Sequence, residues 1–364
     1  MDRRRFLVGA VGASSLMVLP GCADLVEVVA QSCPTDPTES GGVTWTPDIA
    51  HPVFWGVQDL TVASGAPRNL RIFYPTVEGF TSAPPILKLC LVRWPVVLFL
   101  HGQPPAGIPT NGYHRRWWQL PAVLARSGFV VVVPSHLPAP PTEDAEPAVA
   151  AALRDIDWVR TQWSDSTWVH KQPEFTAVAG HSWGAMLAAR VAAARPAFAA
   201  FVSLSGPYLE LGPALPSLTP VAAPSFLMWA NGNGPGIDQE DLDGPNHLWD
   251  QLTQPRYSAV YQGEHFDYLP ESDTGRAPRG SCPAVGAVAA DLAALFIAAN
   301  IQVPLSRTTV GVDLQPPRVS LTQRQEFFAG AHLQGLGRFQ SQPGCRLDLR
   351  WVLGNGTGSR RLGP

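Results

Sequence analysis

A pentapeptide near the middle of the chain, Gly-His-Ser-Trp-Gly at residues 180–184, holds a serine in a pattern that supports nucleophilic chemistry. A short apolar strand is expected just before it, at residues 175–179, and an alanine-rich helix just after it, at residues 185–194. In that context Gly-x-Ser-x-Gly forms a sharp strand-to-helix turn that exposes the serine hydroxyl, and its glycines leave room for neighbouring backbone. The pattern therefore predicts that Ser182 is a catalytic nucleophile.

A serine hydroxyl is a weak nucleophile and needs a general base that takes its proton. The best candidate is His265, in the sequence Gly-Glu-His-Phe at residues 263–266, which follows an expected strand at residues 258–261. Two other histidines fit less well, because His247 lies inside an expected helix and His332 lies in the C-terminal part of the chain. We therefore predict that His265 is the general base.

A carboxylate should orient the imidazole of the base from the loop that follows the expected strand at residues 226–229. Close to the end of this strand the chain has only two asparagines, Asn231 and Asn233. Glycines in the same loop allow a later carboxylate to reach back, and we favour Asp238 as the acid. Asp241 is the alternative, because it stands four residues before a proline that is expected to begin the next helix. The remaining candidates in this loop are Asp243 and Glu240.

A second tract that favours acyl transfer, His101-Gly102-Gln103, follows an expected buried strand at residues 96–100. Acyl transfer needs two hydrogen-bond donors for the carbonyl oxygen as it becomes negative. We predict that these donors are the backbone N–H groups of Trp183 and Gln103. His101 is expected to hold its loop through hydrogen bonds rather than to act as a base. Residues predicted to bind the substrate are Gly102 and three aromatic residues, Tyr113, Trp117 and Phe266.

Short apolar runs alternate with helical patterns along the chain, which is typical of an α/β fold with a mostly parallel sheet flanked by helices. An antiparallel hairpin is expected first, with strands at residues 60–62 and 70–74. The connection between residues 204 and 224 is short, so we expect a small lid or none. The other expected strands are at residues 96–100, 129–133, 175–179, 201–204, 226–229 and 258–261, and the helices at residues 117–127, 143–163, 185–194 and 285–299.

Taken in chain order, these features resemble the α/β-hydrolase superfamily. The resemblance rests on the strand that ends in His-Gly, on residues 127–134, on the serine pentapeptide and on the Gly-Glu-His-Phe tract. Within the superfamily the chain is similar to chlorophyllases, dienelactone hydrolases and platelet-activating-factor acetylhydrolases. The resemblance covers residues 57–299 and implies hydrolysis of carboxylic esters without a metal or an organic cofactor. The chain departs from this group at the acid, and it has Ser135 where many relatives have an aspartate, which we interpret as structural.

The N-terminus has the features of an export signal. Three arginines at residues 3–5 precede an apolar stretch at residues 8–19 that is too short for a membrane span. The arginines and the following Phe-Leu resemble a twin-arginine signal. The sequence Leu-Pro-Gly-Cys resembles a lipoprotein cleavage box, so we predict that Cys22 carries a lipid that anchors the protein to the membrane of the cell envelope, on its periplasmic or extracellular face. An ordinary signal peptide is the alternative.

These features divide the chain into four parts. Residues 1–21 are expected to be the signal and residues 22–50 a tether rich in proline, serine, threonine and glycine. The hydrolase domain is expected at residues 51–300. Residues 301–364 form a C-terminal extension, in which we predict a strand at residues 347–353.

The cysteines give a further expectation about the compartment. An even number remains after the lipid-bearing cysteine, and in an oxidising compartment this favours two disulfides. Buried free thiols are the alternative. No Cys-x-x-Cys pair is present, which argues against a zinc site. The four cysteines are Cys33, Cys90, Cys282 and Cys345.

Composition narrows the class of function. The formal net charge is -3 and no basic stripe is present, so nucleic acid is not an expected partner. Apolar residues make up 45% of the chain and charged residues only 15%, which suits a compact enzyme. We therefore expect an exported serine hydrolase that cleaves small-molecule or lipid esters. The alternatives are an amidase or a polyester depolymerase with the same catalytic residues, or a catalytically inactive lipoprotein that uses the fold for binding.

Overall fold

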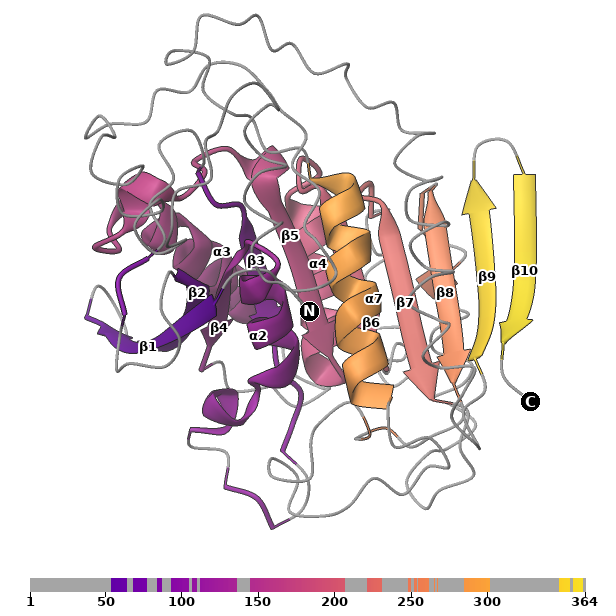
Figure 1. The fold of residues 1–364 in the computed structure, drawn as a ribbon, viewed down its shortest axis with the longest axis horizontal. Helices are drawn as coiled ribbons and strands as arrows, with labels where there is room; N and C mark the ends of the chain where they lie inside the picture. Colours follow the sequence, from indigo (N-terminus) through magenta and orange to yellow (C-terminus); the bar gives the residue numbers. More distant parts are fainter. Residues whose placement is uncertain are drawn as a thin grey trace, which may run out of the picture.

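Ten strands form one sheet in the described part of the chain (Figure 1). The computed structural model describes residues 54–63, 68–76, 84–86, 93–104, 107–109, 112–135, 145–206, 221–230, 248–249, 252–253, 255–261, 265, 267, 285–301, 347–353 and 356–362. The strands are β1 Phe54–Val62, β2 Arg68–Thr76, β3 Val96–Leu100, β4 Val130–Pro134, β5 Thr176–His181, β6 Ala200–Leu204, β7 Ser225–Ala230, β8 Arg256–Tyr261, β9 Leu347–Leu353 and β10 Gly356–Leu362. Their order across the sheet is β1-β2-β4-β3-β5-β6-β7-β8-β9-β10.

The centre of the sheet is parallel, from β4 through β3, β5, β6 and β7 to β8. Strands that are covered on both faces read as continuous apolar runs, and all five residues of β3 and of β4 are buried. At the N-terminal side, β1 and β2 form the expected antiparallel hairpin, and β2 pairs antiparallel with β4. The predicted α/β class and its N-terminal hairpin are confirmed.

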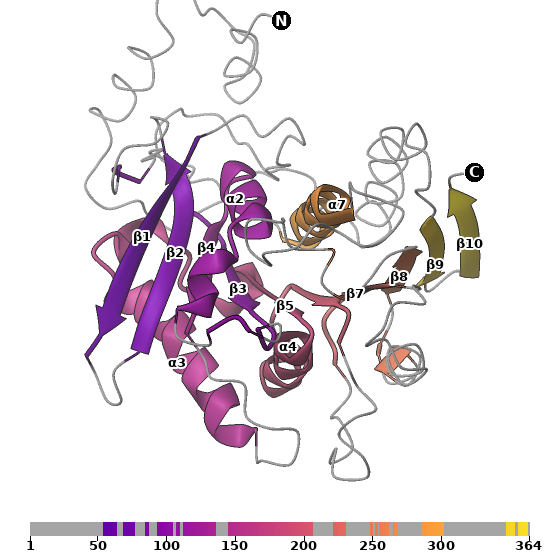
Figure 2. The same cartoon turned by 90° about the horizontal axis from the view of Figure 1, so that it is seen from below.

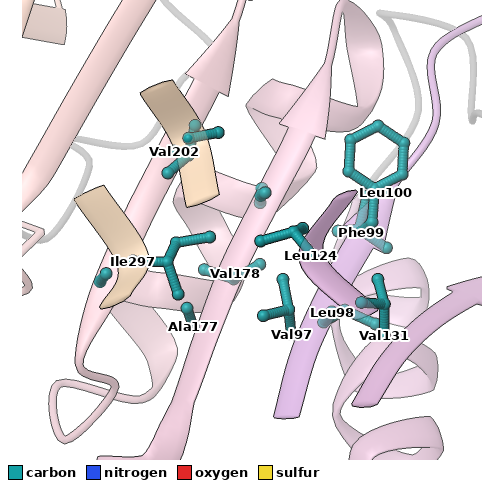
Figure 3. Close-up of a cluster of buried hydrophobic side chains, with 14 of the residues drawn as sticks. Val97, Leu98, Phe99, Leu100, Leu124, Val131, Ala177, Val178, Val202 and Ile297 are labelled. Carbon is teal, nitrogen blue, oxygen red and sulfur yellow. The ribbon is translucent and has the colours of Figure 1, made fainter. Parts of the chain in front are cut away.

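Helices cover both faces of the sheet (Figure 2). Helices α2 Gln119–Arg126 and α7 Val285–Asn300 pack together on one face, and α3 Glu146–Thr161 and α4 Trp183–Ala194 pack together on the other. Figure 3 shows the core on the first face, where Leu124 of α2 and Ile297 of α7 lie beside Val178 of β5, and all three are fully buried. Burial of one such side chain contributes about 1.5–3 kcal/mol to stability.

One helix begins later than the sequence pattern predicts. A helix was expected at residues 117–127, but residues Tyr113–Arg116 form a short 3-10 helix, η3, and α2 begins only at Gln119. Trp117 between them has an extended backbone, with φ -81° and ψ 97°. Pro121 falls in the first turn of α2, where its missing N–H group leaves no intrahelical bond unmade.

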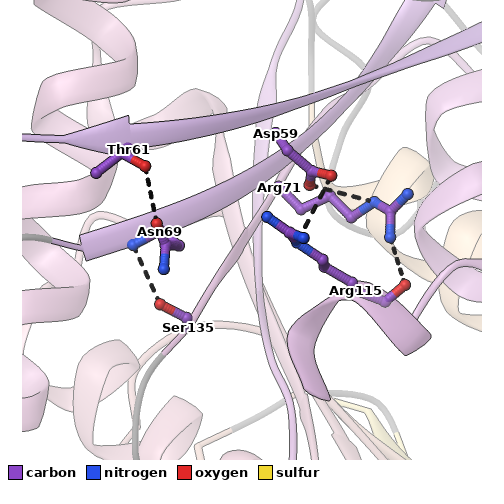
Figure 4. A network of polar contacts seen from close by, with 6 residues as sticks. All are labelled: Asp59, Thr61, Asn69, Arg71, Arg115 and Ser135. Atoms are coloured by element: carbon purple, nitrogen blue, oxygen red, sulfur yellow. Dashed lines mark hydrogen bonds and ion pairs between the residues drawn. The ribbon is translucent and has the colours of Figure 1, made fainter. Parts of the chain in front are cut away.

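Polar contacts attach the N-terminal hairpin to the rest of the fold (Figure 4). Asp59 of β1 forms ion pairs with Arg71 of β2 at 3.7 Å and with Arg115 of η3 at 3.6 Å, and the Arg71 guanidinium donates to the carbonyl oxygen of Arg115. The N–H of Asn69 donates to Ser135 Oγ at 3.1 Å, and the N–H of Ser135 donates to the carbonyl of Asn69 at 2.8 Å. The structural interpretation of Ser135 is therefore confirmed.

The last strands of the chain extend the same sheet. Strand β9 pairs antiparallel with β8, and β10 pairs antiparallel with β9 (Figure 1). The predicted strand at residues 347–353 is confirmed. Part of the expected C-terminal extension thus continues the sheet of the hydrolase domain.

Several expectations concern segments that lie outside the described residues. These are the signal at residues 1–21, the tether at residues 22–50 and the connection at residues 207–220, where a small lid or none is expected. They stay predictions. Within the described residues, no helix combines the length and the apolar character that crossing a membrane requires.

Candidate active site

Ser182 occupies the turn between β5 and α4. Its backbone angles are φ 54° and ψ -130°, a region that costs a residue other than glycine about 1–3 kcal/mol. Backbone hydrogen bonds hold the turn: the N–H of Ser182 donates to the carbonyl of Leu204 on β6 at 2.8 Å, and the N–H of Ala185 donates to the carbonyl of Ser182 at 2.9 Å. The strained, half-buried serine at the carboxyl end of a parallel strand has the geometry that its pentapeptide predicts.

The glycines of the pentapeptide allow a very close approach of backbone segments. A Cβ on Gly184 would lie 2.1 Å from the carbonyl oxygen of Leu100, and a Cβ on Gly180 would lie 2.3 Å from the carbonyl oxygen of Gly184. Helix α4 therefore begins directly against the ends of β3 and β5. The first N–H groups of a helix lack partners within the helix and carry partial positive charge, which favours an anion at this position.

The loop after β3 runs along the other side of the serine turn. A Cβ on Gly102 would lie 2.6 Å from the Cβ of Ser182. His101 is buried, its Nδ1–H donates to the carbonyl of Gly102 at 2.8 Å, and its ring contacts the ring of Tyr113 edge-on with the centroids 5.4 Å apart. These contacts agree with the structural role expected for His101. Gln103 follows Gly102 and is exposed, and its role in the oxyanion hole stays a prediction.

His265 comes from the segment after β8 and is half-buried. The centroid of its ring lies 4.8 Å from the centroid of the His181 ring, at an interplanar angle of 50°. The carbonyl oxygen of His265 accepts a hydrogen bond of 2.8 Å from Nε2 of His181. Because His181 immediately precedes Ser182, the fold brings the predicted base and the predicted nucleophile to the same end of the sheet.

Sequence reasoning missed His181. It is the last residue of β5 and is fully buried. Burial, and next to it the charge of His265, lowers the pKa of His181 well below 6.5, so this imidazole is neutral. Its ring packs against Trp117 with the centroids 4.9 Å apart. The signal in the sequence is a histidine at the end of an otherwise apolar strand, next to the nucleophile.

Two of the aromatic residues predicted to bind the substrate are almost completely buried. The exposed fractions of Tyr113 and Trp117 are 1% and 2%. Trp117 packs between Phe99 and His181, with ring centroids 5.0 Å and 4.9 Å away. Both rings thus support the histidines of the site, and a contact of either ring with the substrate stays a prediction.

A buried carboxylate follows the base. The exposed fraction of Asp267, two residues after His265, is 6%, which is unusual for an aspartate. Sequence reasoning did not single out Asp267.

Among the described residues, no group of three histidine, cysteine or acidic side chains is arranged to hold a metal ion.

Comparison with known families matches residues 95–234 to the family described as the alpha/beta hydrolase fold. The matched segment runs from the start of β3, through the loop of Gly102 and the turn of Ser182, to just beyond β7. Residues 95–234 thus match the α/β-hydrolase family, and the chain has the α/β-hydrolase fold. The predicted superfamily is thus confirmed, while the narrower similarity to chlorophyllases, dienelactone hydrolases and platelet-activating-factor acetylhydrolases stays a prediction.

Among solved structures, this α/β-hydrolase is similar to a ferulic acid esterase from Streptomyces cinnamoneus. The TM-score is 0.50 at 16% sequence identity, and the match covers 79% of this chain and 98% of the esterase. At this identity the likeness concerns the fold. No curated protein matches the sequence.

Other predicted residues of this α/β-hydrolase lie outside the described part of the chain. All four candidate acids, one aromatic residue, the lipidation site and the remaining cysteines fall there, so their roles stay predictions. They are Asp238, Asp241, Asp243, Glu240, Phe266, Cys22, Cys33, Cys90, Cys282 and Cys345.

Proposed function

We propose that this α/β-hydrolase is an exported serine esterase that cleaves carboxylic esters through an acyl-enzyme on Ser182. The observation that carries the proposal is the strained turn of Ser182, which packs against Gly102. The residue before it, His181, forms a hydrogen bond with the backbone of His265. Backbone strain of this kind persists only where the surroundings enforce it, and it is concentrated at functional sites.

In the first half of the reaction, the hydroxyl oxygen of Ser182 attacks the carbonyl carbon of the ester while the imidazole of His265 takes the hydroxyl proton. The tetrahedral intermediate collapses by breaking the bond to the alcohol oxygen. His265 returns its proton to that oxygen, the alcohol departs, and the acyl group stays on Ser182.

In the second half, water attacks the acyl-enzyme with His265 as the base. The bond between the acyl carbon and the serine oxygen breaks, the serine takes the proton from His265, and a carboxylic acid is released. In both halves the N–H groups of Trp183 and Gln103 hold the negative oxygen. Each such donor contributes roughly 3–4 kcal/mol to lowering the barrier.

The proposal places the enzyme outside the cytoplasm, with a lipid on Cys22 as its anchor to the membrane. The N-terminal sequence supports export, and the tether gives the hydrolase domain distance from the lipid surface. The substrate class is a small-molecule or lipid ester. The name of the structural neighbour, a ferulic acid esterase, supports ester hydrolysis as the class of reaction.

Replacement of Ser182 tests the proposal. We expect Ser182→Ala to lower the turnover of short-chain nitrophenyl esters by at least about 10³-fold, because the nucleophile is lost. A fluorophosphonate probe should label the unmodified protein at Ser182 and leave the variant unlabelled. Ser164→Ala, at an exposed serine after α3, is the matched control and should keep full activity. Wild-type turnover in Ser182→Ala would exclude the mechanism.

The acid is tested separately. Of Asp238→Asn and Asp241→Asn, the variant that removes the true acid should lose on the order of 10⁴-fold in kcat, because the imidazole then takes the wrong tautomer. If neither variant loses activity, the catalytic acid is another residue.

A panel of nitrophenyl esters, methyl ferulate, anilides and polyester film separates an esterase from an amidase or a depolymerase. Absence of both labelling and turnover would favour an inactive binding protein.

A further inference from the structure

One hydrogen bond connects the segment that carries the predicted base to the strand that carries the nucleophile. Nε2 of His181 lies 2.8 Å from the backbone oxygen of His265, which is 84 residues further along the chain. A carbonyl oxygen can only accept, so His181 must be the donor and must carry its proton on Nε2. The imidazole tautomer of His181 is thereby determined.

The donor is held in place by its surroundings. The His181 side chain is fully buried at the end of β5, and its ring lies 4.9 Å from Trp117 and 4.8 Å from the ring of His265. Trp117 in turn packs on Phe99 of β3. On the remaining side, a Cβ on Gly102 would lie only 3.1 Å from Nδ1 of His181. An imidazole that is packed in this way has little freedom to rotate, so its Nε2–H is a fixed point.

The charge state of His181 preserves this arrangement. Burial lowers the pKa of His181 well below 6.5, and the neighbouring His265 lowers it further. A neutral His181 keeps one N–H donor and places no positive charge next to the base. The imidazole of His265 can therefore take the proton of Ser182 without repulsion from a second imidazolium.

We propose that His181 is a positioning residue, whose Nε2–H holds the backbone of His265 in register with Ser182. The inference rests on the proposed function, in which Ser182 is the nucleophile and His265 the base. Because His181 and Ser182 are adjacent, this hydrogen bond connects the backbone of the base to the end of β5 that carries the nucleophile. Misplacement of a reacting group by 1 Å is sufficient to cost about 10²-fold in rate.

A matched pair of substitutions separates the hydrogen bond from the packing. His181→Gln keeps an N–H donor near the position of Nε2, whereas His181→Met has a similar length and no donor. We expect His181→Met to lose on the order of 10²-fold in kcat and in the rate of fluorophosphonate labelling, with KM changed by no more than about twofold. His181→Gln should recover most of this loss. Equal losses in the two variants, or wild-type kcat in His181→Met, would overturn the inference.

A measurement without any substitution covers the case in which these variants do not fold. Nitrogen-15 NMR of histidine-labelled protein distinguishes an Nε2–H from an Nδ1–H imidazole. We expect His181 to be in the Nε2–H form at neutral pH, and an Nδ1–H form would contradict the hydrogen bond. Ser182→Ala, assayed in parallel, keeps the two proposals distinguishable. If that variant is inactive while His181→Met is fully active, only the positioning role fails; if it retains wild-type activity, both fail.

Discussion

At the scale of single residues, the two serines with left-handed backbone show how the fold holds strain. In the described residues, Ser182 with φ 54° and Ser205 with φ 47° are the non-glycine residues with positive φ. Each directly follows a parallel strand, and each donates its N–H to the last part of the next strand: Ser182 to Leu204 at 2.8 Å and Ser205 to Met228 at 2.7 Å. The neighbouring strand thus fixes the turn that ends the strand before it.

This strain predicts an order of stability among variants of Ser182. Ser182→Gly and Ser182→Ala both remove the hydroxyl, but only glycine adopts positive φ without a steric penalty. We expect the free energy of unfolding of Ser182→Gly to exceed that of Ser182→Ala by about 1 kcal/mol in urea denaturation, because relief of strain outweighs the greater freedom of glycine in the unfolded chain. At Ser164, where φ is not positive, the order should be reversed. A glycine variant less stable than the alanine variant at Ser182 would contradict the strain.

At the scale of elements, the C-terminal hairpin completes the sheet beside the strand that leads to the base. Strand β9 pairs with β8 along the whole of β8, from Arg256 opposite Val352 to Tyr261 opposite Leu347. Without β9, the backbone of β8 would present a row of unpaired N–H and carbonyl groups, which promotes aggregation. The hairpin therefore protects β8 from pairing with another chain. His265 follows four residues after the end of β8.

Deletion of the hairpin tests this protection. Removal of residues 347–364 should lower the Tm and raise light scattering during thermal unfolding, because the edge of β8 is then open. Removal of residues 356–364 takes away β10 alone and leaves β8 paired, so the loss of Tm should be smaller. Equal Tm values for both deletions and the full chain would exclude a stabilising role of β9.

At the scale of the whole molecule, buried histidines make the fold sensitive to acid. Burial is the main cause that lowers the pKa of His114 to about 4, of His170 to about 3 and of His181 well below 6.5. Below pH 6.5 the unfolded chain binds protons at these histidines while the folded chain does not, so the free energy of unfolding falls as the pH falls. Burial has the opposite effect at Asp155, where it raises the pKa of the carboxyl to about 6 in spite of Arg68. Between pH 3.8 and pH 6 the folded chain holds this proton more tightly than the unfolded chain, so the contribution of Asp155 to the free energy of unfolding falls as the pH rises. Three histidines outweigh one carboxyl, so we expect net destabilisation by acid.

His170 is the position at which to measure this effect. Its ring stacks on Phe175 with the centroids 4.0 Å apart, and His170→Phe preserves the aromatic contact while removing the titration. Between pH 6 and pH 4.5 the free energy of unfolding of the variant should fall less steeply than that of the wild type, by about 1.4 kcal/mol per pH unit. Above pH 7.5 the difference between the two proteins should be constant. Parallel curves from pH 8 to pH 4.5 would show that His170 does not contribute.

The sequence by itself determined the features that depend on neighbours along the chain. The serine turn could be predicted because its glycines, the strand before it and the helix after it are contiguous at residues 176–194. The central strands could be predicted because burial on both faces requires unbroken apolar runs. The predicted start of α2, at residue 117, was wrong. The extended backbone at Trp117 follows from its packing against Phe99 and His181 rather than from helical periodicity.

Only the tertiary structure decided which distant residues meet. The hydrogen bond from His181 to His265 joins the end of β5 to the segment after β8, and two strands, β6 and β7, lie between β5 and β8 in the sheet order. The burial of Tyr113 and the pairing of β9 with β8 are of the same kind. Side-chain periodicity specifies the face of an element that is buried, whereas its partners are selected by packing among all elements at once. No local sequence pattern could therefore predict that His181 contacts His265.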